Sequence, residues 1–156
     1  MIYYLFAMQR EADQIDVENK ILVGINAIEL PNTTNDDILV NIGYCGATSD
    51  IQVGTIVEPS EVFDAKTGDR VVIDKLFGCE DIKCFTADEF VTEPIEENRN
   101  IYDMELYKLA QLPHKKIYSL KIVSDNLNEN DCEKYNDQVA WSKIKDILEK
   151  FKYEII

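Results

Sequence analysis

The sequence has little of what metal sites and membrane spans require. Its four cysteines form no C-x-x-C pair, and His114 is the single histidine. We therefore expect no metal site and no cofactor. The apolar start, residues 1–8, is too short to cross a bilayer and has no basic region before it, so it predicts neither a membrane span nor a secretory signal. Thiols with no disulfide pattern and no targeting segment predict a cytoplasmic protein.

Basic residues are also scarce. The chain has 30 acidic and 16 basic residues, a formal charge of −14. Such a surface repels the phosphates of nucleic acids and anionic membranes, so we expect neither as a partner. Hydrophobic residues make up 46% of the chain and aromatic residues 10%, which indicates an ordinary globular core. A length of 156 residues without repeats or linkers predicts a single domain over residues 1–156.

Apolar runs and alternation predict a series of short strands. They fall at residues 2–8, 20–25, 38–42, 51–57, 61–64, 71–73, 83–86 and 116–123. Apolar residues at helical spacing predict helices over residues 101–112, stopped by Pro113, and over residues 139–151. The order of elements predicts an α/β fold, with a parallel crossover leading to residues 116–123 and a more antiparallel or barrel-like middle.

Residues 41–47, Asn-Ile-Gly-Tyr-Cys-Gly-Ala, directly follow an apolar run and contain two glycines. We interpret them as a turn that brings bare backbone to the edge of a sheet, where it suits a ligand. Residues 7–11 and 122–126 also lie at the ends of predicted strands. Because ligands in α/β sheets bind at the carboxyl ends of strands, we expect the three stretches to converge.

Several side chains in these stretches are candidates for chemistry, each with a structural alternative. Asp125, partly desolvated, could hold a proton at neutral pH and release it, or it could form a turn or helix cap. Glu11 could be a second catalytic carboxylate or a solvated acid in a first helical turn. Phe90 could stack on a base or belong to the core. Met104 has the spacing of a core residue, and Glu105 is either an acceptor for a diol or a surface acid.

Five short segments occur in the order found in the nucleoside phosphorylase and nucleosidase superfamily. They are residues 7–11 (AMQRE), 41–47 with 53–57 (NIGYCGA and VGTIV), 86–91 (TADEFV), 103–105 (DME) and 123–126 (VSDN). On these segments the chain resembles that superfamily, and within it most closely the methylthioadenosine/S-adenosylhomocysteine nucleosidases. The resemblance implies a three-layer α/β fold around a mixed, partly barrel-like sheet. Members of the family are longer, so we expect residues 12–40 to be trimmed of one helix region.

The resemblance also implies an activity, which is hydrolysis of the N-ribosidic bond of a purine nucleoside without a cofactor. Asp125 would protonate the purine at N7, and Glu11 would activate the attacking water. Phe90 would stack on the purine, and Glu105 would accept hydrogen bonds from ribose. The substrate-binding residues that the resemblance implies are Met8, Tyr44, Gly46, Phe90, Val91, Met104 and Glu105. A small purine nucleoside is thus the expected partner, and a homodimer the expected assembly.

Four positions depart from the patterns of the superfamily or bear on the choice of nucleophile. Tyr44 replaces a small serine, and a phenol there is expected to crowd the place of water or phosphate. Asn41 stands where phosphorylases have arginine, which favours water, whereas Arg10 lies near their other phosphate-contacting arginine. Lys121 stands where the hydrolases often have arginine. Two alternatives remain beside the hydrolase: a phosphate-dependent phosphorylase, and a catalytically silent, shortened relative that binds nucleosides or only assembles.

Overall fold

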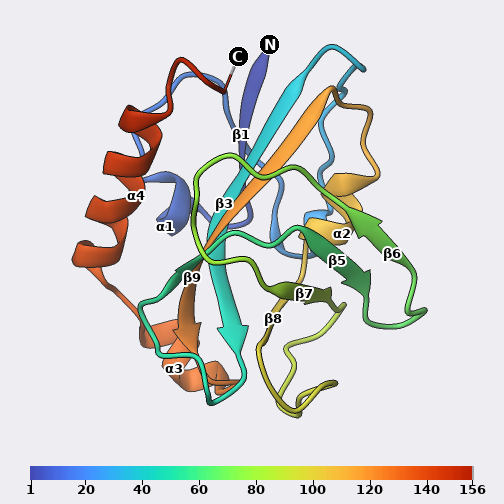
Figure 1. Cartoon of the computed structure of the whole chain (residues 1–156), viewed down its shortest axis with the longest axis vertical. Helices are drawn as coiled ribbons and strands as arrows, with labels where there is room; N and C mark the ends of the chain where they lie inside the picture. The colour runs from blue at the N-terminus through green and yellow to red at the C-terminus, as the bar shows by residue number, and fades with distance from the viewer. Residues whose placement is uncertain (156) are drawn as a thin grey trace.

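The computed structural model describes residues 1–155 and has a mixed α/β fold (Figure 1). Its strands are β1 (Ile2–Phe6), β2 (Lys20–Leu22), β3 (Ile38–Ala47), β4 (Ile56–Val57), β5 (Glu61–Asp64), β6 (Arg70–Val72), β7 (Lys83–Thr86), β8 (Asn100–Asp103) and β9 (Lys116–Asp125). Its helices are α1 (Gln9–Ala12), α2 (Leu106–Ala110), α3 (Glu129–Lys134) and α4 (Gln138–Lys150), with a 3-10 turn η1 (Ile25–Ala27). All nine strands join one mixed sheet, so the expected α/β class is confirmed.

Strand β3 is the centre of the sheet because it pairs with three other strands. Its first half is parallel to β1, with Leu5 opposite Asn41 as the last pair. Nearly its whole length is parallel to β9, which confirms the predicted parallel arrangement of residues 116–123. At Gly46 and Ala47 it pairs instead with the antiparallel β8, on the side opposite β9. On that side, residues 42–45 face neither β1 nor β8, and the sheet opens there.

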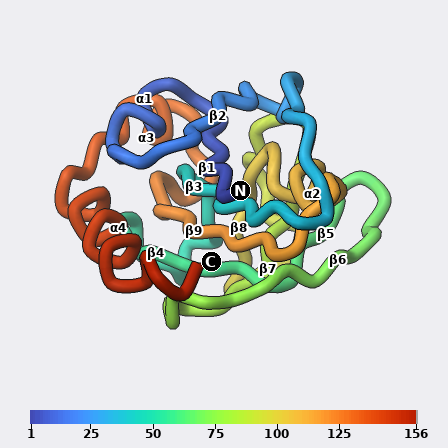
Figure 2. Tube along the Cα trace, turned by 90° about the horizontal axis from the view of Figure 1, so that it is seen from above, coloured from blue at the N-terminus to red at the C-terminus, as the bar shows by residue number. Residues whose placement is uncertain are grey.

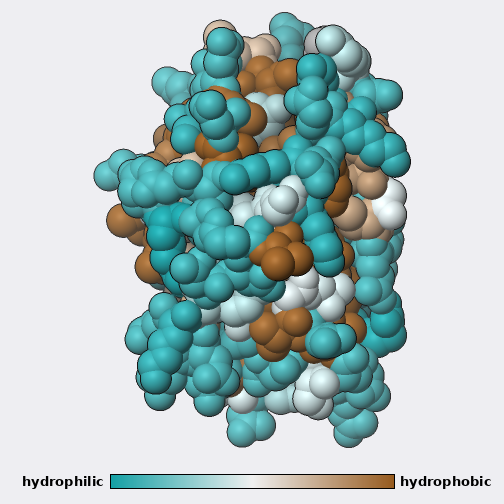
Figure 3. All heavy atoms as spheres, turned by 90° about the vertical axis from the view of Figure 1, so that its left-hand side faces the viewer, coloured by the Kyte–Doolittle hydropathy of each residue, from teal (hydrophilic) through white to brown (hydrophobic). Residues whose placement is uncertain are grey.

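The two faces of β3 and β9 have different covers, because side chains alternate along a strand. Even-numbered positions such as Ile42 and Ile122 pack with Trp141 of α4. Odd-numbered positions such as Leu39 and Val123 pack in the other core cluster, which includes residues of α2, β5 and β7. Figures 1 and 2 show α4 and α2 on opposite sides of these strands. The outer face of the molecule on the α4 side is mainly hydrophilic, with scattered apolar side chains (Figure 3).

Three of the expected elements are wrong in part. Residues 41–47 continue β3 and do not form a turn. The expected helix over residues 101–112 begins as strand β8 and becomes α2 only at Leu106, because residues 100–103 are buried between β7 and β3. Of the expected strand at 51–57, only Ile56–Val57 pairs, and it pairs with β9. The helix over residues 139–151 is confirmed as α4.

The connection from α1 to β3 is short and holds only β2 and η1 as regular structure. Asn26 within η1 has a φ of 65°, a left-handed conformation that asparagine tolerates better than most residues. Within residues 1–155, none of the helices is both long and apolar enough to span a membrane.

Candidate active site

A cavity of about 320 Å³ lies where β3 leaves β1 and meets β8. It is lined by Ala7, Met8, Arg10, Glu11, Ile25, Tyr44, Cys45, Gly46, Phe90, Tyr102, Asp103, Met104, Glu105, Asp125, Glu129, Cys132 and Glu133. The structure thus brings all the expected site residues except Val91 around one space. Val91 lines a small hollow that shares Gly46, Phe90 and Met104 with the cavity.

Glu11 stands in the gap where β3 has no strand partner on one side. Its side chain comes from α1, directly after β1, and the residue is 2% exposed. Oε2 accepts a hydrogen bond from the backbone N–H of Tyr44 at 2.7 Å, and Oε1 accepts one from the N–H of Met8 at 2.9 Å. The carboxylate therefore replaces part of the missing strand pairing. Burial raises the pKa of Glu11, although these hydrogen bonds and nearby Lys121 oppose the shift.

Asp125 ends β9 on the other side of β3 and is 1% exposed. Its Oδ1 accepts from the hydroxyl of Ser124 at 2.7 Å, and its Oδ2 accepts from the N–H of Asn128 at 3.1 Å. The structural alternative for this residue is therefore present, because the carboxylate holds the turn before α3, and the same carboxylate lines the cavity. Burial raises the pKa of Asp125, and the hydrogen bonds from Ser124 and Asn128 act against that rise.

Both glycines of β3 are required because these two acids approach so closely. A Cβ at Gly43 would lie 2.6 Å from Oε2 of Glu11. A Cβ at Gly46 would lie 3.0 Å from Leu127 and 3.2 Å from Oδ2 of Asp125. The glycines therefore bring bare backbone to the cavity as expected, but from within a strand.

Glu105 is the third acid of the cavity and is 7% exposed. It precedes α2, and its Oε2 accepts from the backbone N–H of Asn26 at 3.0 Å. Its Oε1 accepts no hydrogen bond from residues 1–155, so it is free to accept one from a ligand. Burial, reinforced by the charge of Asp103, raises the pKa of Glu105 to about 7, against the opposing charge of Lys121. This acid therefore changes charge near neutral pH.

The raised pKa of Glu105 predicts a pH-dependent gain in stability for Glu105→Gln. Between about pH 4.5 and 7, the unfolded chain releases a proton that the native carboxyl still holds, so wild-type stability falls as the pH rises through that window. Glutamine has no such proton to lose. We expect the variant to be more stable than wild type by about 2 kcal/mol at pH 8 and nearly equal to it at pH 5. Urea unfolding at both pH values checks this, with Glu29→Gln, the same substitution at an exposed position, as the control.

Arg10 and Tyr44 are held by contacts within the protein. Arg10 donates to the carbonyls of Cys132 and Tyr135, both at 3.1 Å, and its guanidinium lies 4.8 Å from the centre of the Tyr44 ring. The Tyr44 hydroxyl accepts a 2.8 Å hydrogen bond from Nε1 of Trp141 on α4. The phenol was expected to crowd the place of the nucleophile, but its hydroxyl is bonded to α4 instead.

The sequence motifs give no role to Asp103 or Lys121. Asp103 lines the cavity, and Lys121 does not line it but forms an ion pair with Asp103. Lys121 Nζ lies 3.2 Å from Oδ2 of Asp103, and both side chains are almost completely buried, with exposures of 2% and 0%. A lysine within the apolar alternation of β9 is the signal that could have drawn attention to this position, since buried lysines need a partner. Within the described chain, no group of three or more His, Cys, Asp or Glu side chains is arranged to hold a metal ion.

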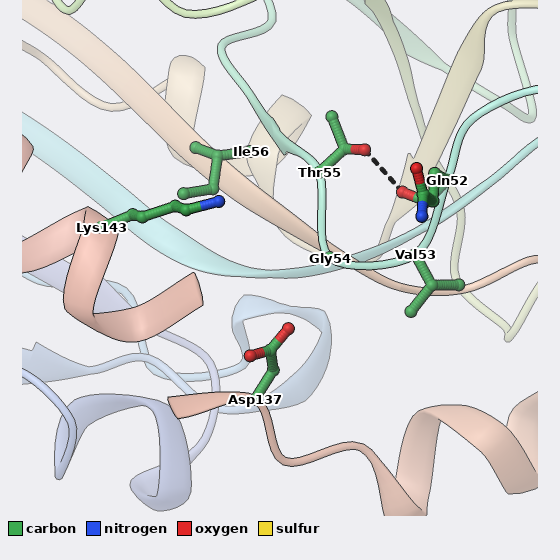
Figure 4. A pocket seen from close by; sticks show the side chains of 7 residues that line it. All are labelled: Gln52, Val53, Gly54, Thr55, Ile56, Asp137 and Lys143. Carbon is green, nitrogen blue, oxygen red and sulfur yellow. Dashed lines mark hydrogen bonds between the residues drawn. The ribbon is translucent and has the colours of Figure 1, made fainter. Parts of the chain in front are cut away.

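A second hollow, of about 500 Å³, lies between the loop before β4 and the start of α4 (Figure 4). It is lined by Gln52, Val53, Gly54, Thr55, Ile56, Asp137 and Lys143. Asp137 is already engaged, because Oδ1 caps α4 through the N–H groups of Val139 and Ala140 and Oδ2 accepts from the Tyr135 hydroxyl. The hollow is lined by none of the four buried acids described above, Glu11, Asp103, Glu105 and Asp125.

Comparison with solved structures identifies the fold. No protein-family model matches the chain, and no curated protein matches it by sequence. The MTAN of Chlamydia trachomatis is similar to it, with a TM-score of 0.75 at 15% identity over 99% of this chain and 98% of that one. Its adenine-bound structure gives a TM-score of 0.73 at 14% identity with the same coverage. The 5′-methylthioadenosine nucleosidase of Arabidopsis thaliana gives 0.70 at 14% identity, over 99% and 95% of the two chains. The chain therefore has the fold of the methylthioadenosine nucleosidases.

Proposed function

We propose that the chain hydrolyses the N-ribosidic bond of a purine nucleoside. The observation that carries the proposal is the meeting of Asp125 and Glu11 at one cavity. Both are buried carboxyl groups of raised pKa, and they reach the cavity from opposite sides of β3. A pair of acids in different hydrogen-bonding environments can divide the roles of acid and base. Structures of similar fold hold adenine or MTA, which makes methylthioadenosine the first substrate to test.

In the proposed reaction, the bond between C1′ of the ribose and N9 of the base breaks, and its electron pair leaves with the base. Asp125 donates its proton to N7, so the base departs without a net negative charge. Water attacks C1′, which passes through an oxocarbenium-like state, and Glu11 accepts the proton of that water. The products are the free base and the free sugar. Acid–base assistance of this kind accelerates reactions by roughly 10²–10⁴-fold.

The remaining residues of the cavity divide between the two ends of such a substrate. Glu105 offers its free Oε1 to the ribose hydroxyls, beside Met104. Phe90 offers an aromatic face to the base, and Val91 lies beside it in the small hollow that adjoins the cavity. This division follows the resemblance and fits the lining of the cavity.

The nucleophile is better proposed as water than as phosphate. Asn41 is 2% exposed and engaged on both sides, donating to the Leu5 carbonyl and accepting from the Ser119 hydroxyl. The guanidinium of Arg10 donates hydrogen bonds to two backbone carbonyls. The acids that line the cavity also repel a phosphate dianion. The phosphorylase alternative therefore has little support from the geometry.

We also propose that the chain forms the homodimer that the resemblance implies. Four exposed apolar side chains fall within β2 and the connection that follows it: Leu22, Ile25, Ile28 and Leu30. Ile25 also lines the cavity, so a second copy of the chain that contacted this stretch would lie beside the site. Exposed apolar side chains are often covered in protein–protein contacts.

Release of adenine from methylthioadenosine, followed by liquid chromatography, tests the proposed function. We expect free adenine and methylthioribose at the same rate in phosphate-free buffer and in buffer with added phosphate. S-Adenosylhomocysteine, adenosine and inosine assayed alongside define the base and the 5′ substituent. Strict dependence on phosphate would replace the hydrolase by a phosphorylase. Binding of adenine by calorimetry with no turnover of any of these nucleosides would indicate the silent relative.

A further inference from the structure

The buried ion pair of Lys121 and Asp103 lies beside Glu105, the proposed ribose acceptor. The proposed reaction gives neither residue of the pair a role. Lys121 projects from the middle of β9, four residues before Asp125, and Asp103 ends β8. A buried lysine is strongly destabilising unless an acid compensates its charge, and Asp103 at 3.2 Å does so. The pair joins the strand that carries Asp125 to the strand that leads to Glu105.

Asp103 also organises the backbone around Glu105. Its Oδ2 accepts from the N–H of Leu106 at 2.7 Å and from the N–H of Glu105 at 3.3 Å, which fixes the start of α2. Its Oδ1 accepts from the hydroxyl of Thr86 at 2.6 Å and from the thiol of Cys84 at 3.4 Å. Thr86 ends β7, the strand before the segment that carries Phe90. One carboxylate thus ties together both ends of the proposed substrate site.

The charges around this pair do not balance. Lys121 is the cation shared by three acids, Asp103, Glu105 and Glu11. Glu105 in turn faces Asp103, Lys121, Glu11 and the N–H of Asn26. Acids that share one cation in a buried space do not all ionise independently, and the least compensated one keeps its proton longest. Asp103 has the direct ion pair and Glu11 has two backbone donors, whereas Glu105 has one donor.

We propose that Lys121 and Asp103 are a positioning pair that controls the charge and the placement of Glu105, and so decides when the site can hold ribose. This inference rests on the proposed role of Glu105 as the ribose acceptor. An ionised Glu105 offers acceptors to two hydroxyl groups, whereas a protonated one uses an oxygen for its own proton. Consistent with this, burial and Asp103 raise the pKa of Glu105 to about 7 while Lys121 lowers it.

The test is a carboxyl titration of Glu105 in the substrate-free protein, by NMR with glutamate labelled at the side-chain carbon. The resonance is assigned by its loss in Glu105→Gln. We expect Asp103→Asn to lower the titration midpoint by about one pH unit, because it removes a negative neighbour and frees Lys121. We expect Lys121→Met to raise the midpoint by a similar amount. The double variant should return toward wild type, and exposed Lys115→Met should leave the midpoint unchanged.

Shifts in the same direction for both variants, or no shift in either, would overturn the inference, because a purely structural pair has no reason to move the midpoint in opposite senses. If Lys121→Met does not fold, Asp103→Asn and the charge-neutral double variant still show in which direction the titration midpoint of Glu105 moves. The titration needs no substrate, so it stands apart from the nucleosidase assay: absent adenine release would refute the proposed function and leave the coupling intact. With turnover, Lys121→Met should raise KM at pH 7 more than it lowers kcat.

Discussion

Asp125→Asn is expected to reduce adenine release by roughly 10²–10⁴-fold, because an amide cannot deliver a proton to N7 of the base. Asparagine keeps the shape of the side chain, and its oxygen can still accept from the N–H of Asn128 while its amide donates to Ser124. The fold should therefore persist. Wild-type activity should fall as the pH rises and Asp125 loses its proton, at a pH above the usual range of an aspartate because burial raises its pKa. The residual activity of the variant should lack that decline.

The matched control for this variant is Asp131→Asn, the same substitution at an exposed position of α3. It should release adenine at the wild-type rate. Calorimetric binding of adenine to both variants separates loss of the acid from loss of the cavity. A wild-type rate and an unchanged pH profile in Asp125→Asn would remove this residue from the chemistry.

The long regular elements are predictable because their signals are local. The apolar run of residues 116–123 reflects burial of both faces of β9, and the helical spacing of residues 139–151 reflects the packing of one face of α4 on the sheet. Helix α3 had no such signal, because none of its residues is buried. Its local marks are Asn128, whose side chain accepts from the N–H of Asp131 as an N-cap, and the charges of its ends, with acids in the first turn and Lys134 in the last.

The features that the sequence predicts wrongly or does not reveal depend on contacts between residues that are distant in the chain. The glycines of β3 look like turn residues in isolation, but Gly43 is required by Glu11 and Gly46 by Asp125 and Leu127. The apolar spacing predicts a helix that includes residues 101–103. Their pairing with β7 and β3 decided otherwise. In the same way, no local pattern pairs Lys121 with Asp103.

The residues that meet at the cavity are nevertheless largely predictable from the sequence, because they lie in short motifs at strand ends. Met8, Glu11, Phe90, Glu105 and Asp125 all line the same cavity. The motifs give the positions of these residues in the sequence, but they do not give their hydrogen-bond partners. The engagement of Arg10 with two carbonyls and of Tyr44 with Trp141 required the folded structure.

Glu11→Gln is the second change for which we expect a large effect, a loss of roughly 10²–10⁴-fold in kcat, because an amide cannot accept the proton of the attacking water. The variant also disturbs the structure. Both carboxylate oxygens accept from backbone N–H groups, of Met8 and Tyr44, whereas glutamine has one acceptor oxygen. One buried N–H is left without an acceptor, which destabilises by about 1–3 kcal/mol. Single-turnover adenine release and urea unfolding, measured on the same samples, report the two effects separately.

Gly43→Ala separates the chemical from the structural part of this loss. Its Cβ would lie 2.6 Å from Oε2 of Glu11, so the carboxylate has to move while its charge and basicity remain. We expect reduced kcat with adenine binding retained, since the base end of the cavity is lined by other residues. Exposed Glu18→Gln, with the same charge change as Glu11→Gln, should match wild type in both assays. If Glu11→Gln loses stability while kcat stays at the wild-type value, Glu11 completes the sheet at β3 and another group activates the water.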